Sequence, residues 1–281
     1  MSFFLDFFSY GFLLRALLGG ALVALCASLL GTSLVLTRYA MIGDGLSHVA
    51  FGALALAMAL SAAPLAVAIP VVMAAAFLLL RLSDSSRIRG DAAIAMLSSA
   101  SMAVGVIVIS LSSGMNTDLH SFMFGSILSM SRGDLILAVI LSLAVTLLFT
   151  LSYNNLFAVT FDENFARASG VRAGLWNALL AVLASVTVVL GMRIMGAILI
   201  SSLIIFPPLS AMRLSGSFKG VTLISAVASL VCFVSGLFLS YALDLPSGPV
   251  IVMVNVFCFS LFSLIRFIRS RRPAPDLTPD P

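Results

Sequence analysis

The feature that most constrains this chain is a succession of apolar runs, each about as long as a bilayer is thick, with short polar connections between them. A transmembrane helix needs roughly 20 predominantly apolar residues. Nine runs come close to that length: 11–36, 41–61, 64–80, 92–113, 134–152, 174–191, 193–212, 220–243 and 247–266. We therefore predict an all-α, polytopic transmembrane helical bundle. It has eight or nine spans, and the count depends on 193–212, which is short and interrupted by Gly196 and two prolines.

Composition excludes a soluble protein. The chain is 61% hydrophobic and only 9% charged, whereas an average soluble domain is about 25% charged. The basic residues are gathered between the apolar runs and near the C-terminal end, where they serve as topology markers rather than as a surface for nucleic acid. The three cysteines, Cys26, Cys232 and Cys258, show no CxxC spacing and are expected to be buried apolar residues. The lipid bilayer is thus the first predicted partner.

The same basic residues predict the orientation of the chain. Clusters of arginine and lysine follow the third, fifth, seventh and last runs, and basic clusters stay on the cytoplasmic side. With nine crossings all four clusters fall on that side, which puts the N-terminus outside and the C-terminus inside. We expect one integral membrane domain over residues 1–270. The polar, Pro-rich tail 271–281 is expected to be disordered and cytoplasmic.

An acid and a histidine stand one helical turn apart inside the second run. Asp44 is the only charged residue between Arg38 and Arg81, and His48, one of two histidines, follows it by four positions. Residues four apart share one face of a helix. A carboxylate in hydrocarbon is costly unless it faces a cavity, a partner or an ion, so we interpret the pair as part of a transport pathway. One oxygen and one nitrogen ligand suit a divalent transition metal, and two facing copies of the chain would supply the four ligands that zinc prefers.

A structural interpretation of the pair competes with this one. Asp44 lies near the start of a predicted span, and Asp is a preferred N-cap residue. In that case Asp44 caps the helix that starts near Gly43, and His48 bonds to a neighbouring span.

The second histidine lies in a predicted external loop. His120 follows Asp118 by two positions, so the two side chains could receive a metal at the entrance of the pathway. Loop histidines need further partners to bind metal, and the alternative is that both are ordinary solvated residues.

The sequence lacks the motifs of an ATPase or a hydrolase. No GxxxxGK[ST] phosphate-binding loop and no HExxH metalloprotease motif occurs. The chain is therefore predicted not to be an enzyme, and any energy from ATP must come from a separate partner subunit.

Five motifs occur in an order that resembles a known family. They are GDGLSHVAFG at 43–52, FMFGSIL at 122–128, TFDENFARASGV at 160–171, GMRIMGAILISSLIIFPP at 191–208 and LDLPSGP at 243–249. Together they resemble the membrane permease subunits of bacterial zinc/manganese/iron ABC importers, over nearly the whole chain. The resemblance implies a multi-pass protein of the bacterial cytoplasmic membrane.

The resemblance also implies partners and site residues. It implies a homodimer that accepts a divalent metal from an extracytoplasmic metal-binding protein and is driven by cytoplasmic ABC ATPase subunits. Asp44 and His48 match the family's metal ligands, and the metal is cargo rather than a permanently bound cofactor. The segment around Glu163, Ala166 and Gly170 is similar to the one that docks on the ATPase.

Two details of the resemblance bear on the metal. Ser126 stands where many relatives carry Asp, which puts a third acidic ligand in question. The continuation HVAFGALALA is more similar to the zinc branch than to manganese-type members, so zinc is the favoured cargo.

The alternative function is an ion-coupled secondary transporter that acts without an ATPase. Asp44 would then be a proton relay, and the Gly- and Pro-interrupted run 191–208 suits such folds. Against it, the sequence shows no internal inverted repeat.

Overall fold

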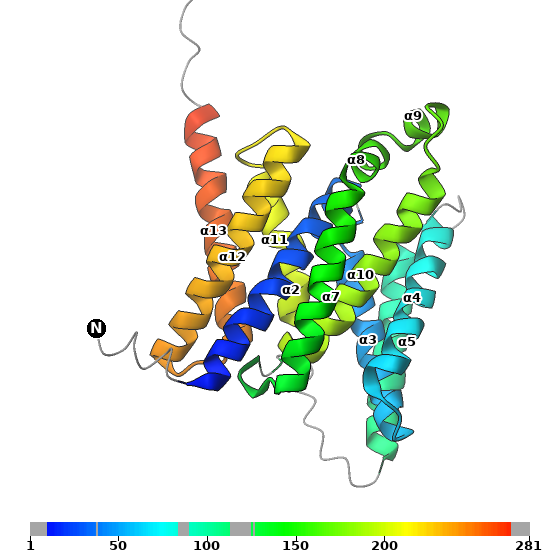
Figure 1. Cartoon of the computed structure of the whole chain (residues 1–281), viewed down its shortest axis with the longest axis vertical. Coiled ribbons are helices and arrows are strands. Elements are labelled where there is room, and N and C mark those ends of the chain that lie inside the picture. The colour runs from blue at the N-terminus through cyan, green and yellow to red at the C-terminus, as the bar shows by residue number, and fades with distance from the viewer. Residues whose placement is uncertain (1–9, 38, 84–89, 113–124, 126, 271–281) are drawn as a thin grey trace, which may run out of the picture.

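The computed structural model describes residues 10–37, 39–83, 90–112, 125 and 127–270, and within these ranges every regular element is a helix (Figure 1). The elements are α2 (Gly11–Leu36), α3 (Ile42–Ala59), α4 (Pro64–Ser83), α5 (Gly90–Leu111), the 3₁₀ turn η1 (Ile127–Ser129), α7 (Arg132–Leu151), α8 (Tyr153–Phe161), α9 (Glu163–Ala168), α10 (Ala173–Met195), α11 (Ala197–Ala211), α12 (Phe218–Leu243) and α13 (Ser247–Ser270). The tail 271–281 lies outside the described residues, so its predicted disorder stays a prediction.

Eight of the described helices are long and apolar enough to cross a bilayer. The predicted all-α bundle of eight or nine spans is therefore confirmed. The ninth predicted run forms α11, which has only 15 residues and is about 22 Å long at 1.5 Å per residue. This is shorter than the hydrocarbon thickness of about 30 Å. The short length of this helix explains why the sequence predicts either eight or nine spans.

A glycine separates α10 from α11. Gly196 has φ +86°, a conformation that residues with a Cβ rarely adopt, and here the chain leaves α10 and turns back as α11. A second positive-φ glycine, Gly125, packs directly on this break: a Cβ at Gly125 would lie 2.1 Å from the carbonyl carbon of Met195. The two glycines thus allow backbone segments distant in sequence to touch.

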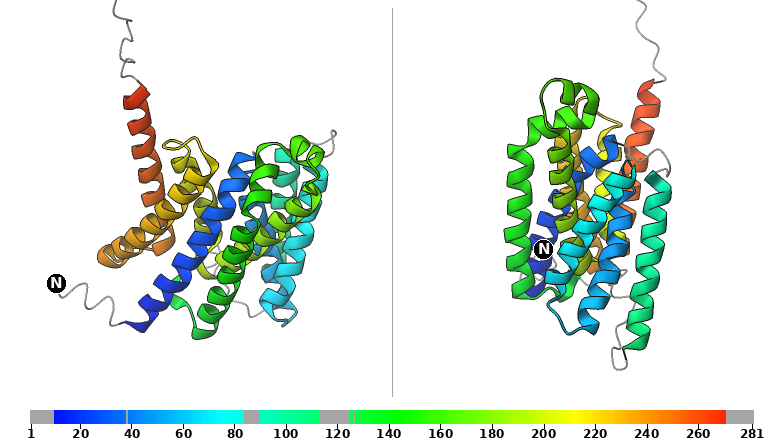
Figure 2. Two further views of the ribbon diagram at one scale, coloured as in Figure 1. Left: turned by 45° about the horizontal axis from the view of Figure 1, so that its top comes forward. Right: turned by 90° about the vertical axis from the view of Figure 1, so that its right-hand side faces the viewer.

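The helices form a buried centre and an exposed periphery. α2, α3 and α10 are mostly buried, whereas only a small part of α5, α7 and α13 is buried. α3 packs against α4, α5, α10 and α11, while α2 packs against α7, α10, α11 and α12. Figure 2 shows α7 and α5 on opposite flanks of the molecule. The exposed apolar side chains of the flanking helices are those that lipid would cover.

One end of the bundle carries most of the described basic residues, and we call it the basic end. The α8 and α9 helices, the α11–α12 connection and the C-terminal part of α13 all lie there (Figure 1). Arg266 near the end of α13 donates to the carbonyl oxygen of Met212 after α11, at 3.4 Å. Arg81 and Arg167 line one hollow at this end. Because α11 returns to the basic end, the described clusters share one side, as the nine-crossing arrangement predicts.

The opposite end is held by polar contacts of two other arginines. Arg193 of α10 pairs with Asp134 of α7 at 2.9 Å, and Arg15 of α2 donates to the carbonyl oxygen of Met130 at 3.0 Å. Asp134 also caps α7 in a reciprocal capping box with Ser131. One carboxylate therefore both starts α7 and ties it to α10.

The three cysteines are free thiols. Cys26 and Cys232 are buried, as predicted, whereas Cys258 on α13 is half-buried.

Candidate functional site

The site begins in the first two turns of α3. The helix starts at Ile42 with Met41 at the N-cap position, so Asp44 is the third helical residue and not the cap. The interpretation of Asp44 as an N-cap is therefore wrong. An acid in the first turn is nevertheless favourable, because it faces the positive end of the helix dipole.

Asp44 and His48 occupy the one uncovered part of this stretch. From Ile42 to Ala55 all residues except these two are buried. The Asp44 side chain remains 39% exposed and the His48 side chain 23% exposed. Over this stretch, neighbouring helices thus cover α3 on all sides except the strip that presents the acid and the imidazole.

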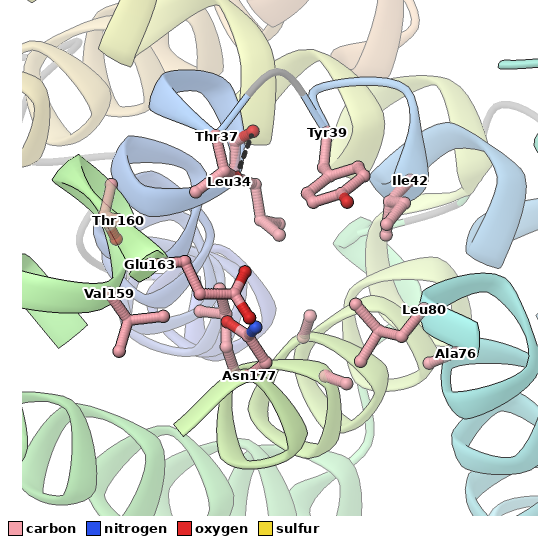
Figure 3. Close-up of a pocket in the computed structure, with 13 residues that line it drawn as sticks. Leu34, Thr37, Tyr39, Ile42, Ala76, Leu80, Val159, Thr160, Glu163 and Asn177 are labelled. Carbon is pink, nitrogen blue, oxygen red and sulfur yellow. Dashed lines mark hydrogen bonds between the residues drawn. The ribbon is translucent and has the colours of Figure 1, made fainter. Parts of the chain in front are cut away.

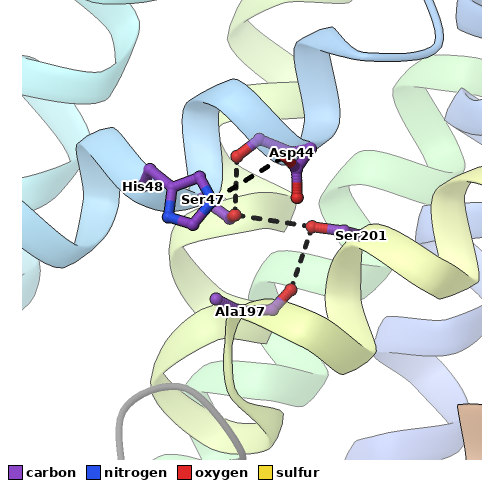
Figure 4. A network of polar contacts seen from close by, with 5 residues as sticks. All are labelled: Asp44, Ser47, His48, Ala197 and Ser201. Atoms are coloured by element: carbon purple, nitrogen blue, oxygen red, sulfur yellow. Dashed lines mark hydrogen bonds and ion pairs between the residues drawn. The ribbon is translucent and has the colours of Figure 1, made fainter. Parts of the chain in front are cut away.

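The two side chains point toward each other. The distance from Asp44 Oδ2 to His48 Nε2 is 3.7 Å (Figure 4), and among the described residues neither side chain has another polar partner. Two ligands bound tetrahedrally to one zinc ion at about 2.1 Å would be about 3.4 Å apart. The observed separation is close to this, so a small rotamer change would let both groups bind the same ion.

One copy of the chain supplies only half of a usual metal site. Among the described residues no group of three or more His, Cys, Asp or Glu side chains could hold an ion.

A pair of serines connects the site to α11. Ser47 donates to the backbone carbonyl of Asp44 at 2.7 Å, and its hydroxyl lies 3.4 Å from that of Ser201, which in turn donates to the carbonyl of Ala197 at 2.9 Å (Figure 4). Sequence reasoning missed Ser201. The only available signal was a pair of serines, 201 and 202, within an otherwise apolar run.

Glycines on the other faces of α3 let α5 approach closely. A Cβ at Gly45 would lie 2.6 Å from Ile94 Cγ2, and a Cβ at Gly52 would lie 2.6 Å from the carbonyl oxygen of Ser101. This tight packing holds α3 rigidly, which is what a binding site needs.

The predicted coupling segment forms two short helices at the basic end. Glu163 begins α9 and forms an ion pair with Arg167. Ala166 is buried in a small cluster with Val159 and Ala173. Gly170, at φ +85°, ends α9 in the left-handed conformation common at helix C-termini. Asp162 caps α9 by accepting from the backbone N–H of Phe165 at 2.9 Å.

The predicted coupling residues thus start, anchor and end this element. Sequence reasoning did not single out Phe161 and Phe165, which are 62% and 69% exposed. Asp118, His120 and Ser126 lie outside the described residues, so their predicted roles stay predictions.

Comparison with known proteins identifies the family. A model of the ABC 3 transport family matches residues 9–266. The chain belongs to that family. It is 35% identical over 260 residues to a probable metal transport system membrane protein of Thermotoga maritima, covering 92% of each chain. It is 29% identical to a manganese transport system membrane protein of Halalkalibacterium halodurans, over 93% of this chain and 90% of the relative.

A solved structure agrees with the fold of this ABC 3 permease. The structure of PsaBC from Streptococcus pneumoniae in complex with Fab superposes with a TM-score of 0.86 at 28% identity, over 96% of this chain and 99% of the other. The predicted family resemblance is confirmed. The chain is a multi-pass permease of the bacterial cell membrane for metal import, and it is a transport subunit rather than an enzyme.

Proposed function

We propose that this ABC 3 permease moves its metal across the membrane past Asp44 and His48. The observation that carries the proposal is selective exposure: within Ile42–Ala55 only these two side chains are not buried. The polarity of an acid and an imidazole explains why each is less covered than an alanine. It does not explain why both lie together at the same opening. A passing cation compensates the dehydration of both groups.

The complete site is formed by a homodimer. A twofold axis facing the exposed strip of α3 would bring two carboxylates and two imidazoles together. Coordination is transient, because a transported ion must leave as readily as it enters.

Energy comes from a separate cytoplasmic ATPase that docks on α8 and α9. Glu163, Ala166 and Gly170 build the docking element, and an extracytoplasmic metal-binding protein delivers the ion near Asp118 and His120. Family membership favours this ATP-driven mechanism over an ion-coupled secondary transporter, the alternative that the sequence left open.

The cargo is a divalent transition metal, with zinc and manganese as the two ions to compare. The sequence around His48 favours zinc, and so does the general order of metal affinities for nitrogen and oxygen ligands. The Halalkalibacterium relative is named for manganese, which favours that ion. Competition between equal concentrations of Zn²⁺ and Mn²⁺ during uptake decides between them.

The decisive experiment is metal uptake into vesicles that contain the permease and its ATPase. Asp44→Asn removes the charge but keeps the shape, and His48→Gln removes the imidazole. We expect both variants to insert normally and to lose uptake of both ions. Asp91→Asn is the matched control, since Asp91 also lies in the first turn of a spanning helix, α5, outside the site.

Normal uptake by Asp44→Asn would refute the site assignment. Uptake driven by a proton gradient in vesicles that lack the ATPase would instead favour the secondary transporter.

A further inference from the structure

A cavity lies at the basic end between α8, α9 and α10, and neither Asp44 nor His48 is among the residues that line it. It has a volume of about 210 Å³ and lies next to a hollow of about 290 Å³ between α4 and α10. The two spaces share four lining residues, Tyr39, Leu80, Glu163 and Asn177. Figure 3 shows Glu163 turned toward Asn177 within the inner space, with Tyr39 and Leu80 on the facing wall. The family's transport site does not account for this cavity.

The charge at the opening is positive. Arg81 and Arg167 both line the outer hollow, and among the described residues that line it Glu163 is the one acid. Glu163 pairs with Arg167, whereas no carboxylate of the described residues forms an ion pair with Arg81. A guanidinium has five N–H donors, so Arg167 keeps donors for a second anionic partner. Two guanidinium groups at the opening disfavour a metal cation and favour an anion.

One wall of the opening is apolar and continues onto the outer face of α4. Phe77 and Leu80 line the hollow, and Phe77 and the adjacent Leu78 are 40% and 47% exposed. On the α10 side, no atom of the described residues lies within 4 Å of the position that a Cβ on Gly174 would take. The opening therefore has a charged part, an apolar part and free space between them.

Aromatic residues place the opening at the depth of lipid headgroups. Trp and Tyr concentrate at the two membrane interfaces. Here the only Trp, Trp176, lies in the first turn of α10, and Tyr39 and Tyr153 lie at the same end. Tyr10 and Tyr241 lie at the opposite end, at the start of α2 and near the end of α12.

We propose that this cavity binds an anionic phospholipid of the cytoplasmic leaflet. Its phosphate accepts hydrogen bonds from Arg81 and Arg167, its headgroup enters the space beside Gly174, and an acyl chain lies along Phe77 on α4. Basic pockets between transmembrane helices on the cytoplasmic side are suited to such headgroups. A free phosphate would use the arginines but not the apolar wall, so the lipid is the better fit. The inference stands independently of the transport site.

The test is lipid retention by the purified full-length chain, measured by native mass spectrometry. The probes are palmitoyl-oleoyl phosphatidylglycerol and the phosphatidylcholine with the same acyl chains. We expect the wild-type chain to retain one phosphatidylglycerol and to exchange phosphatidylcholine freely. Arg81→Gln should weaken retention about fivefold, the usual effect of losing one membrane-facing basic residue. Gly174→Leu should fill the space beside α10 and weaken phosphatidylglycerol retention at least as much as Arg81→Gln does.

Two matched controls carry the same changes elsewhere at the basic end. Arg266→Gln removes an arginine on α13, and Gly216→Leu adds a side chain at another glycine with open surroundings. Both should retain phosphatidylglycerol like the wild type. Equal retention of the two lipids by the wild type would overturn the proposal. So would displacement of phosphatidylglycerol by millimolar inorganic phosphate, or equal losses in the controls. The wild-type comparison needs no substitution, so it decides the matter even where a variant does not fold.

Discussion

Single residues set how closely the central helices approach one another. Gly31 on α2 faces the backbone of α11, where a Cβ would lie 2.1 Å from the carbonyl oxygen of Ile204. A flexible side chain could move away, but a carbonyl group inside a packed helix can move only with its backbone. The small residue is therefore required by the contact between α2 and α11, which in turn holds Ser201 beside α3.

This contact predicts different effects of two glycine substitutions on the stability of the folded protein. Gly31→Ala should destabilise the folded protein by about 2 kcal/mol, in the range for overpacking a tight contact. Gly174→Ala, which adds the same methyl group in open space, should leave stability unchanged or raise it by up to about 1 kcal/mol, because alanine is the better helix former. Thermal unfolding of both variants in the same detergent measures the difference. Equal melting temperatures would contradict the close contact.

Among the elements, α9 differs from the spanning helices in how it is held. It is only six residues long, too short to be stable alone, and depends on the Asp162 cap, the buried Ala166 and the Gly170 end. The exposed aromatic residues Phe161 and Phe165 contribute little to holding α9 in place. Large exposed apolar side chains mark a surface that a protein or a membrane covers, and on α9 we assign this surface to the proposed ATPase partner.

The exposed aromatic surface on α9 predicts a separation of stability from partner binding. Phe165→Ala should change the free energy of unfolding by less than about 0.5 kcal/mol, as expected for an exposed position. It should nevertheless reduce co-purification of the ATPase and its stimulation by metal. Phe257→Ala is the control, because Phe257 is equally exposed, at 71%, but lies on α13. Full ATPase capture by Phe165→Ala would exclude this residue from the docking surface.

For the whole molecule, the direction of α11 decides which connections share a side. Because α11 returns to the basic end, two connections face the same compartment. They are the end of α3 at Leu60 and the turn before α13 at Leu245. Gly216, between α11 and α12, faces the other. Leu60 and Leu245 are 67% and 48% exposed, so both positions can be probed directly.

Labelling of single cysteines tests this arrangement. In a chain with the three native cysteines replaced by alanine, Leu60→Cys and Leu245→Cys should react with a membrane-impermeant maleimide in intact cells. Gly216→Cys should react only after the cells are permeabilised, because the distribution of basic residues predicts that the basic end is cytoplasmic. Labelling of Leu60→Cys and Leu245→Cys from opposite sides would show that α11 does not reverse the chain.

The sequence by itself determined the class of protein, the positions of the spans and the spacing of Asp44 and His48. These depend on local quantities: the length of an apolar run, the charges at its ends and the turn of a helix. It did not determine that Asp44 and His48 are the uncovered residues of Ile42–Ala55, that Ser201 lies beside Ser47, or that Arg193 pairs with Asp134.

Only the tertiary structure decided these contacts, and the cavity beneath α9 with them. The physical reason is that a buried membrane helix is apolar all round, so its sequence carries little information about which face turns toward which neighbour. That rotation is settled by where glycines such as Gly31 and Gly52 let backbones meet, which is a property of pairs of helices far apart in the chain.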